Sequence, residues 1–166
     1  MSSGPTIFNE SIDAGFFFIA LALIVPLFVA AISGPWTGLL IILAGTYLGD
    51  HLADYSVSSY YGESWTWFAG NILIGFIAGL AFLKTRGRYD TGLAMLIAAA
   101  TATVAIITGS AFAAYADIAV SGIASDTAWS NFIMSIVPFT IDLVLLPIVL
   151  VIYNTIASRI RRAYTA

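Results

Sequence analysis

The sequence predicts an all-α fold, a polytopic membrane helix bundle with about five transmembrane helices. Two observations carry this prediction. Hydrophobic residues make up 60% of the 166 residues and charged residues only 9%, a composition typical of membrane proteins rather than of soluble domains. The apolar residues also form long blocks, and a backbone inside lipid must satisfy its own hydrogen bonds, which favours helices.

The apolar blocks predict helices over residues 14–33, 35–54, 65–84, 91–116 and 131–158. Each block is long enough to cross the hydrocarbon layer, which takes roughly 20 residues in a helix. The turn Ser33-Gly34-Pro35 separates the first two helices, because proline is tolerated in the first turn of a helix. Little chain remains outside the five blocks, so we expect a single integral membrane domain over residues 1–166.

The positive charges predict the orientation of the bundle. All six lysine and arginine residues lie in two short stretches, 84–88 and 159–162, whereas the loops 50–64 and 117–130 carry acids and no lysine or arginine. Basic residues beside membrane helices face the cytoplasm. We therefore expect a cytoplasmic C-terminus and, with five helices, an external N-terminus.

The charge balance and residue types exclude several functions. The net charge of -3 argues against a nucleic acid partner, which needs a dense basic surface. The absence of cysteine and the single histidine leave no expected metal or cofactor site. The sequence has no phosphate-binding glycine loop and no paired nucleophile and base, so we do not expect an enzyme.

Small residues recur at helical spacing in three of the predicted helices. They are Gly38, Gly45, Gly49, Gly75, Gly79, Ala94, Ala98 and Ala102. In membranes such residues mark places where helix backbones approach closely. Tight packing within this chain and docking onto another membrane subunit both remain open.

One acid lies inside an apolar block. Asn131, Ser135, Pro138 and Asp142 are spaced for one face of the last predicted helix, which places the Asp142 carboxyl deep in the bilayer. An ionised carboxylate is costly there. Asp142 is therefore either a ligand, ion or proton site, or the partner of a structural hydrogen bond. The candidate partners for such a bond are Thr101, Thr108 and Asn71.

A second group of polar and aromatic residues falls at the predicted outer ends of the helices. It comprises Asp50, His51, Trp65, Trp67, Asn71, Tyr115, Asp117 and Asn131. Aromatic rings with converging hydrogen-bonding groups suit a small organic ligand. Together with Asp142, these residues form the candidate ligand site. An ordinary wet interface with capping acids is the alternative.

Several stretches carry a resemblance to a known family. They are Gly34-Pro35-Trp36-Thr37-Gly38, Gly49-Asp50-His51-Leu52, Phe68-Ala69-Gly70-Asn71-Ile72-Leu73-Ile74-Gly75, the basic loop 84–88, and Val137-Pro138-Phe139-Thr140 followed by the basic tail 159–162. In this order they resemble the substrate-binding S components of energy-coupling factor (ECF) vitamin transporters. Two features depart from that pattern. The first helix of those proteins has no counterpart before residue 14, and their proline-phenylalanine-asparagine motif reads Pro138-Phe139-Thr140 here.

The resemblance implies capture of a vitamin or cofactor precursor at the outer face of a prokaryotic cytoplasmic membrane. It also implies partners, namely a membrane coupling protein and ABC ATPases that supply the energy. The alternative function is a non-catalytic structural or accessory subunit of a larger membrane complex.

Overall fold

The fold is all-α, as predicted. The structure is a computed structural model that describes the backbone of residues 14–52 and 65–165, with side chains described for 23–45, 65–136, 140–160 and 163. The helices are α1 (Ala14–Ser33), α2 (Pro35–Leu52), α4 (Trp65–Gly79), α5 (Ala81–Thr85), α6 (Gly92–Ala119) and α7 (Ser125–Thr165). The end of the predicted helix 35–54 lies outside the described residues.

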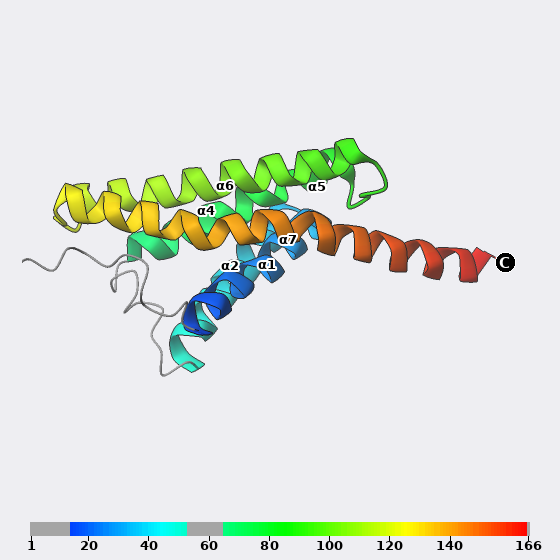
Figure 1. The fold of residues 1–166 in the computed structure, drawn as a ribbon, viewed down its shortest axis with the longest axis horizontal. Coiled ribbons are helices and arrows are strands. Elements are labelled where there is room, and N and C mark those ends of the chain that lie inside the picture. Colours follow the sequence, from blue (N-terminus) through cyan, green and yellow to red (C-terminus); the bar gives the residue numbers. More distant parts are fainter. Residues whose placement is uncertain (1–13, 53–64, 166) are drawn as a thin grey trace, which may run out of the picture.

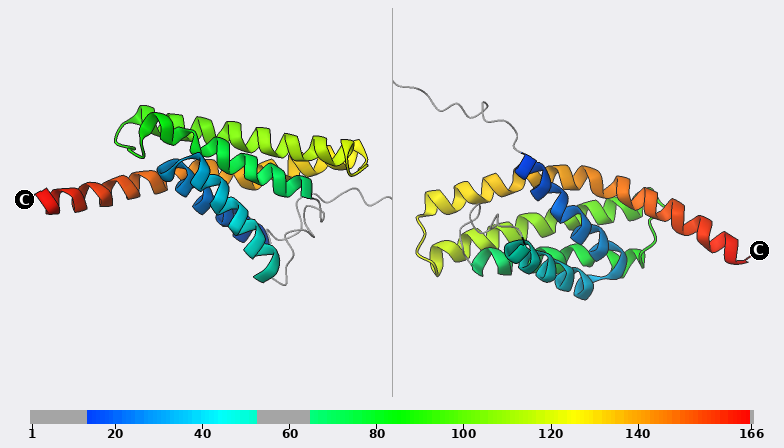
Figure 2. Two further views of the ribbon diagram at one scale, coloured as in Figure 1. Left: turned by 180° about the vertical axis from the view of Figure 1, so that it is seen from behind. Right: turned by 90° about the horizontal axis from the view of Figure 1, so that it is seen from below.

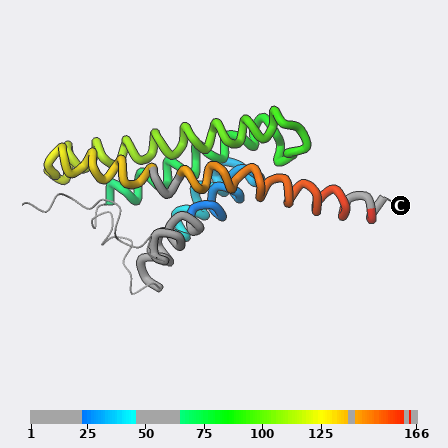
Figure 3. Tube along the Cα trace, in the orientation of Figure 1, coloured from blue at the N-terminus to red at the C-terminus, as the bar shows by residue number. Residues whose placement is uncertain are grey.

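The helices form a layer of three crossed by a hairpin of two. α4, α6 and α7 run side by side, while α1 and α2 pair with each other and cross that layer obliquely (Figures 1 and 2). Within this layer α6 packs against both α4 and α7, and α4 packs on the hairpin helices α2 and α1 as well. The C-terminal part of α7 continues alone past the loop that joins α5 to α6 (Figure 3).

The last helix is longer than the sequence predicts. α7 begins at Ser125 rather than at residue 131 and ends at Thr165 rather than at residue 158. An acid in the first turn, Asp126, is favourable at a helix N-terminus. Neither glycine nor proline follows Pro147, so no residue that stops a helix occurs before the chain ends.

The predicted helix 65–84 is broken in the structure. α4 ends at Gly79 and the short α5 begins at Ala81, while backbone N–H groups at Leu80 and Leu83 bond three residues back. Gly79 lies against the backbone of Pro35, leaving no space for a Cβ. The start of α2 thus presses on α4 at the point where the helix changes geometry.

Three helices among the described residues are long and apolar enough to cross a membrane. They cover Trp65–Thr85, in which α4 and α5 together make one span, Gly92–Ala119 and Ser125–Ile160. The described apolar parts of α1 and α2 are shorter, Leu23–Ser33 and Pro35–Gly45. α7 spans 41 residues, about 60 Å at 1.5 Å per residue, and this is twice the thickness of a hydrocarbon core of about 30 Å.

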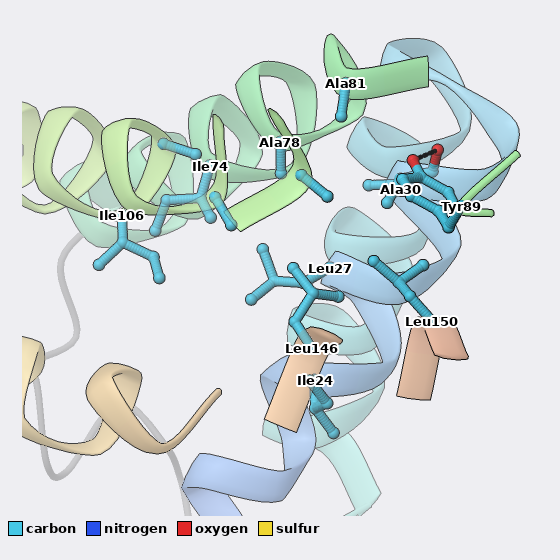
Figure 4. Close-up of a cluster of buried hydrophobic side chains, with 14 of the residues drawn as sticks. Ile24, Leu27, Ala30, Ile74, Ala78, Ala81, Tyr89, Ile106, Leu146 and Leu150 are labelled. Carbon is cyan, nitrogen blue, oxygen red and sulfur yellow. Dashed lines mark hydrogen bonds between the residues drawn. The ribbon is translucent and has the colours of Figure 1, made fainter. Parts of the chain in front are cut away.

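The hydrophobic core joins the hairpin to the three-helix layer. Leu27 of α1 lies beside Leu146 of α7, and Ala30, Ala78 and Leu150 belong to the same cluster (Figure 4). These side chains are at most 3% exposed. Burial of this cluster therefore fixes how α1 crosses α7.

Glycines allow two of the helix crossings to be close. A Cβ at Gly38 of α2 would collide with the carbonyl oxygen of Gly75 on α4, and a Cβ at Gly70 of α4 would lie 2.6 Å from the carbonyl oxygen of Gly109 on α6. Both crossings are thus direct backbone contacts, the arrangement that small residues permit in membranes.

The other residues of the predicted packing set divide into three groups. Ala94, Ala98 and Ala102 are buried along α6. Gly45 is exposed, and no atom would lie within 4 Å of a Cβ placed there, so its predicted role in docking stays a prediction. The surroundings of Gly49 lie outside the described residues.

Candidate functional site

A buried hydrogen-bonded group lies where α4 begins and α6 ends, which we call the Trp67 end of the bundle. The Trp67 indole Nε1–H donates to Asp117 Oδ2 at 2.7 Å, and the Thr66 hydroxyl donates to Asp117 Oδ1. Asp117 and Thr66 are fully buried and Trp67 is 7% exposed. The carboxylate thus ties the first turn of α4 to the last turns of α6, because both of its oxygens accept bonds from α4.

This group unites two predicted ligand residues and adds one that was not predicted. Trp67 and Asp117 come together, but the Trp67 indole N–H and Asp117 Oδ2 are bonded to each other. Thr66 was missed, since a threonine beside two tryptophans carries no periodic signal in the sequence. These hydrogen bonds hold α4 and α6 together at the Trp67 end.

The remaining predicted residues at this end differ in exposure. Trp65 is 58% exposed and Tyr115 67% exposed, while Asn71 and Asn131 are half-buried. The rings of Trp129 and Phe132 form an edge-to-face pair, with centroids 5.5 Å apart. The side chains of Asp50 and His51 lie outside the described residues.

Asp142 lies in the interior of the bundle. Its carboxyl is fully buried, and among the described residues neither carboxylate oxygen has a hydrogen-bond partner. None of the predicted structural bonds, to Thr101, Thr108 or Asn71, is present in the described part of the chain. The Thr101 hydroxyl instead donates to carbonyl oxygens of its own helix, at Ile97 and Ala98. Unpaired buried polar groups are rare in folded proteins and call for an explanation.

Two serines accompany Asp142 in the interior. Ser110 of α6 is 1% exposed and its hydroxyl is unpaired among the described residues. Ser135 of α7 is fully buried and donates to the carbonyl oxygen of Phe132. Ser135 and Asp142 are seven residues apart and therefore share one face of α7. The interior thus holds polar groups on two neighbouring helices.

The opposite end of the bundle, which we call the Tyr89 end, is closed by a tyrosine. Tyr89 is fully buried, and its hydroxyl donates to the carbonyl oxygen of Ala31 at 2.6 Å (Figure 4). The surrounding loop carries the exposed basic residues Lys84, Arg86 and Arg88. The loop is thereby fixed to α1, with its charges facing outward.

No metal centre is visible in the described part of the chain. There, no three histidine, aspartate or glutamate side chains gather closely enough to hold an ion.

Comparison with known proteins decides the family. Residues 10–158 match the family described as ECF-type riboflavin transporter, S component. The chain belongs to this family. The resemblance predicted from the glycine, proline and asparagine stretches is confirmed. No curated protein and no solved structure gives a match.

Membership gives this S component its general role. An S component is the membrane-embedded, substrate-binding subunit of an ECF transporter, and its role is to bind rather than to catalyse. Its apolar helices agree with an integral membrane protein.

Proposed function

We propose that this S component captures riboflavin or a closely related vitamin at the outer face of a prokaryotic cytoplasmic membrane. The observation that carries the proposal is the family match over residues 10–158. It favours capture over the alternative of a structural accessory subunit. The chain has no phosphate-binding loop of its own, so energy for uptake comes from partners, a membrane coupling protein and ABC ATPases.

The charges support an outward-facing Trp67 end. Lys84, Arg86 and Arg88 are at the Tyr89 end, and Arg159 lies further along the same direction on α7. Basic residues flanking membrane helices favour the cytoplasmic side. The C-terminus is then cytoplasmic, the N-terminus external, and the Trp67 end faces the outside, where a vitamin arrives.

The exposed rings at the Trp67 end are suited to receive a flavin. Trp65 and Tyr115 offer aromatic faces, and Asn71 and Asn131 offer amides that both donate and accept. The buried Trp67 and Asp117 hold α4 and α6 in place beneath them. Aromatic walls with a few placed polar groups are the usual lining of organic ligand sites.

Native mass spectrometry of the protein, purified gently from its own membrane, tests this proposal. We expect a bound molecule with the mass of a flavin, together with coupling and ATPase subunits in a fraction of the particles. A stoichiometric complex with unrelated membrane subunits and no small ligand would contradict capture and favour the accessory function.

A further inference from the structure

We infer that Asp142 is the deep contact of the captured ligand, and that its carboxyl accepts a hydrogen bond from an uncharged or cationic donor group on that ligand. This inference rests on the proposed function and specifies which part of the ligand enters the bundle. It explains a fully buried carboxyl with no partner among the described residues, a state that is unfavourable unless a partner arrives.

The position of Asp142 favours a ligand over a structural role. It lies one turn before Leu146, on the same face of α7, and Leu146 belongs to the apolar cluster that includes Leu27 and Ile106. From Leu146 to Leu150 the interior is apolar and closed. Asp142 is therefore the first polar group beyond Tyr153 on this face of α7 when moving from the Tyr89 end toward the Trp67 end.

Ser110 gives a second, independent group, whose hydroxyl has no partner in the described part of the chain. It lies nine residues before the end of α6, and Ser135 lies ten residues after the start of α7, so the two serines are at similar depth. Asp142 is seven residues deeper than Ser135, roughly 10 Å along the helix. A ligand with hydrogen-bonding groups at both ends and that separation would satisfy Ser110 and Asp142 together.

The charges of the chain restrict the ligand group near Asp142. Every lysine and arginine lies within 84–88 or 159–162, so none is available along α6 or along α7 before residue 159. A phosphate beside Asp142 would find no cationic partner and would be buried at high cost. A carboxyl accepts hydrogen bonds in either protonation state, so hydroxyl, imide or amine donors fit. Riboflavin offers such donors in its imide N–H and its ribityl hydroxyls.

The first test measures riboflavin affinity from the quenching of its fluorescence, using the full-length protein in lipid nanodiscs. Asp142→Asn keeps the shape but weakens the acceptor, and we expect the affinity for riboflavin to fall by about 10-fold or more. Asp126→Asn is the matched control, because it changes an exposed acid on the same helix, and its affinity should equal that of the wild type. Equal riboflavin affinity in Asp142→Asn and the wild type would overturn the inference.

Two analogues locate the donor. 3-Methylriboflavin lacks the imide N–H, and lumiflavin lacks the ribityl hydroxyls. We expect the effect of Asp142→Asn to disappear with the analogue that has lost the partner of Asp142. An undiminished effect with both analogues would contradict a direct contact.

The ligand-free protein separates a binding role from a structural one. Because Asp142 has no partner among the described residues, Asp142→Asn should leave the melting temperature without ligand unchanged or raised. A clear fall would show that Asp142 makes a structural bond and would overturn the inference, whether or not riboflavin binds.

A measurement on the wild type guards against a variant that fails to fold. Dicyclohexylcarbodiimide reacts with carboxylic acids in apolar surroundings, and peptide mass spectrometry reads its addition at Asp142. We expect saturating riboflavin to protect Asp142, and equal labelling with and without riboflavin would contradict the contact. Failure of the wild type to bind riboflavin at all would contradict the proposed function itself, which distinguishes the two failures.

Discussion

At the scale of single residues, the molecule separates polar groups that hold the fold from polar groups left free. Asp117 accepts bonds from Trp67 and Thr66, whereas Asp142 and Ser110 have no hydrogen-bond partner among the described residues. Both acids were predicted as ligand residues from their positions near or within apolar blocks. The sequence could not tell them apart, because the difference lies in which neighbouring helix presents a donor.

Trp67→Phe tests the structural role of the Trp67 and Asp117 pair. Loss of the indole N–H leaves a buried carboxylate oxygen without this donor, so the free energy of unfolding should fall by about 1.5–3 kcal/mol. Chemical unfolding in detergent measures it. Trp65→Phe, at an exposed ring, is the control and should change stability little. Equal losses in both variants would show that the bond contributes nothing specific.

Tyr89→Phe tests the closure of the Tyr89 end. The variant loses the bond to Ala31, so its free energy of unfolding should fall by about 1 kcal/mol. Tyr115→Phe, at an exposed ring, is the control and should leave the free energy of unfolding unchanged. Equal free energies of unfolding for Tyr89→Phe and Tyr115→Phe would show that the bond to Ala31 does not stabilise the fold.

The same residue predicts a pH dependence. Burial raises the pKa of the Tyr89 phenol above its ordinary value of 10.0. The folded state therefore keeps the proton longer than the unfolded state does. The stability that the protonated Tyr89 phenol contributes is fully present below pH 10.0 and is lost as the pH rises through the pKa of the folded state. Tyr89→Phe should show a smaller loss of stability over that alkaline range.

At the scale of elements, apolar blocks located the helices, and contacts between helices adjusted their ends. The sequence predicted a helix over 14–33, and α1 has those bounds. It did not predict the break at Leu80, since this follows from Pro35 pressing on Gly79. The predicted start of the last helix, at residue 131, is too late. Residues 125–130 are mostly polar, a pattern typical of a loop, although an acid in this position favours a helix N-terminus.

A pair of glycines on α2 tests the close crossing of α2 and α4. Gly38→Ala places a methyl group against the backbone of Gly75, so the variant should lose about 1–3 kcal/mol of stability through overpacking. Gly45→Ala meets no atom within 4 Å and should be neutral or stabilising, because alanine favours a helix over glycine. Thermal unfolding compares the two. A Gly38→Ala variant as stable as Gly45→Ala would contradict the crossing.

At the scale of the whole molecule, the distribution of charge predicts its orientation. The chain contains no cysteine, so single cysteines can report the side of the membrane. In intact cells a membrane-impermeant thiol reagent should label Ser121→Cys, in the exposed loop before α7, and should not label Arg88→Cys. Both should react after permeabilisation. Labelling of Arg88→Cys in intact cells would reverse the orientation.

The family could be predicted from the sequence and is confirmed, whereas the ligand site stays a prediction. Glycine, proline and asparagine stretches mark helix ends and close contacts, and these are local features that one sequence displays. The family match over residues 10–158 agrees with them. The proposed ligand site draws instead on residues of α4, α6 and α7 that lie far apart in the sequence.

Riboflavin binding by the purified full-length protein in nanodiscs tests the central claim most directly. The account predicts saturable binding of one riboflavin per chain, seen as quenching of its fluorescence. A well-folded protein that leaves riboflavin fluorescence unchanged across the titration would contradict capture of this vitamin by the chain.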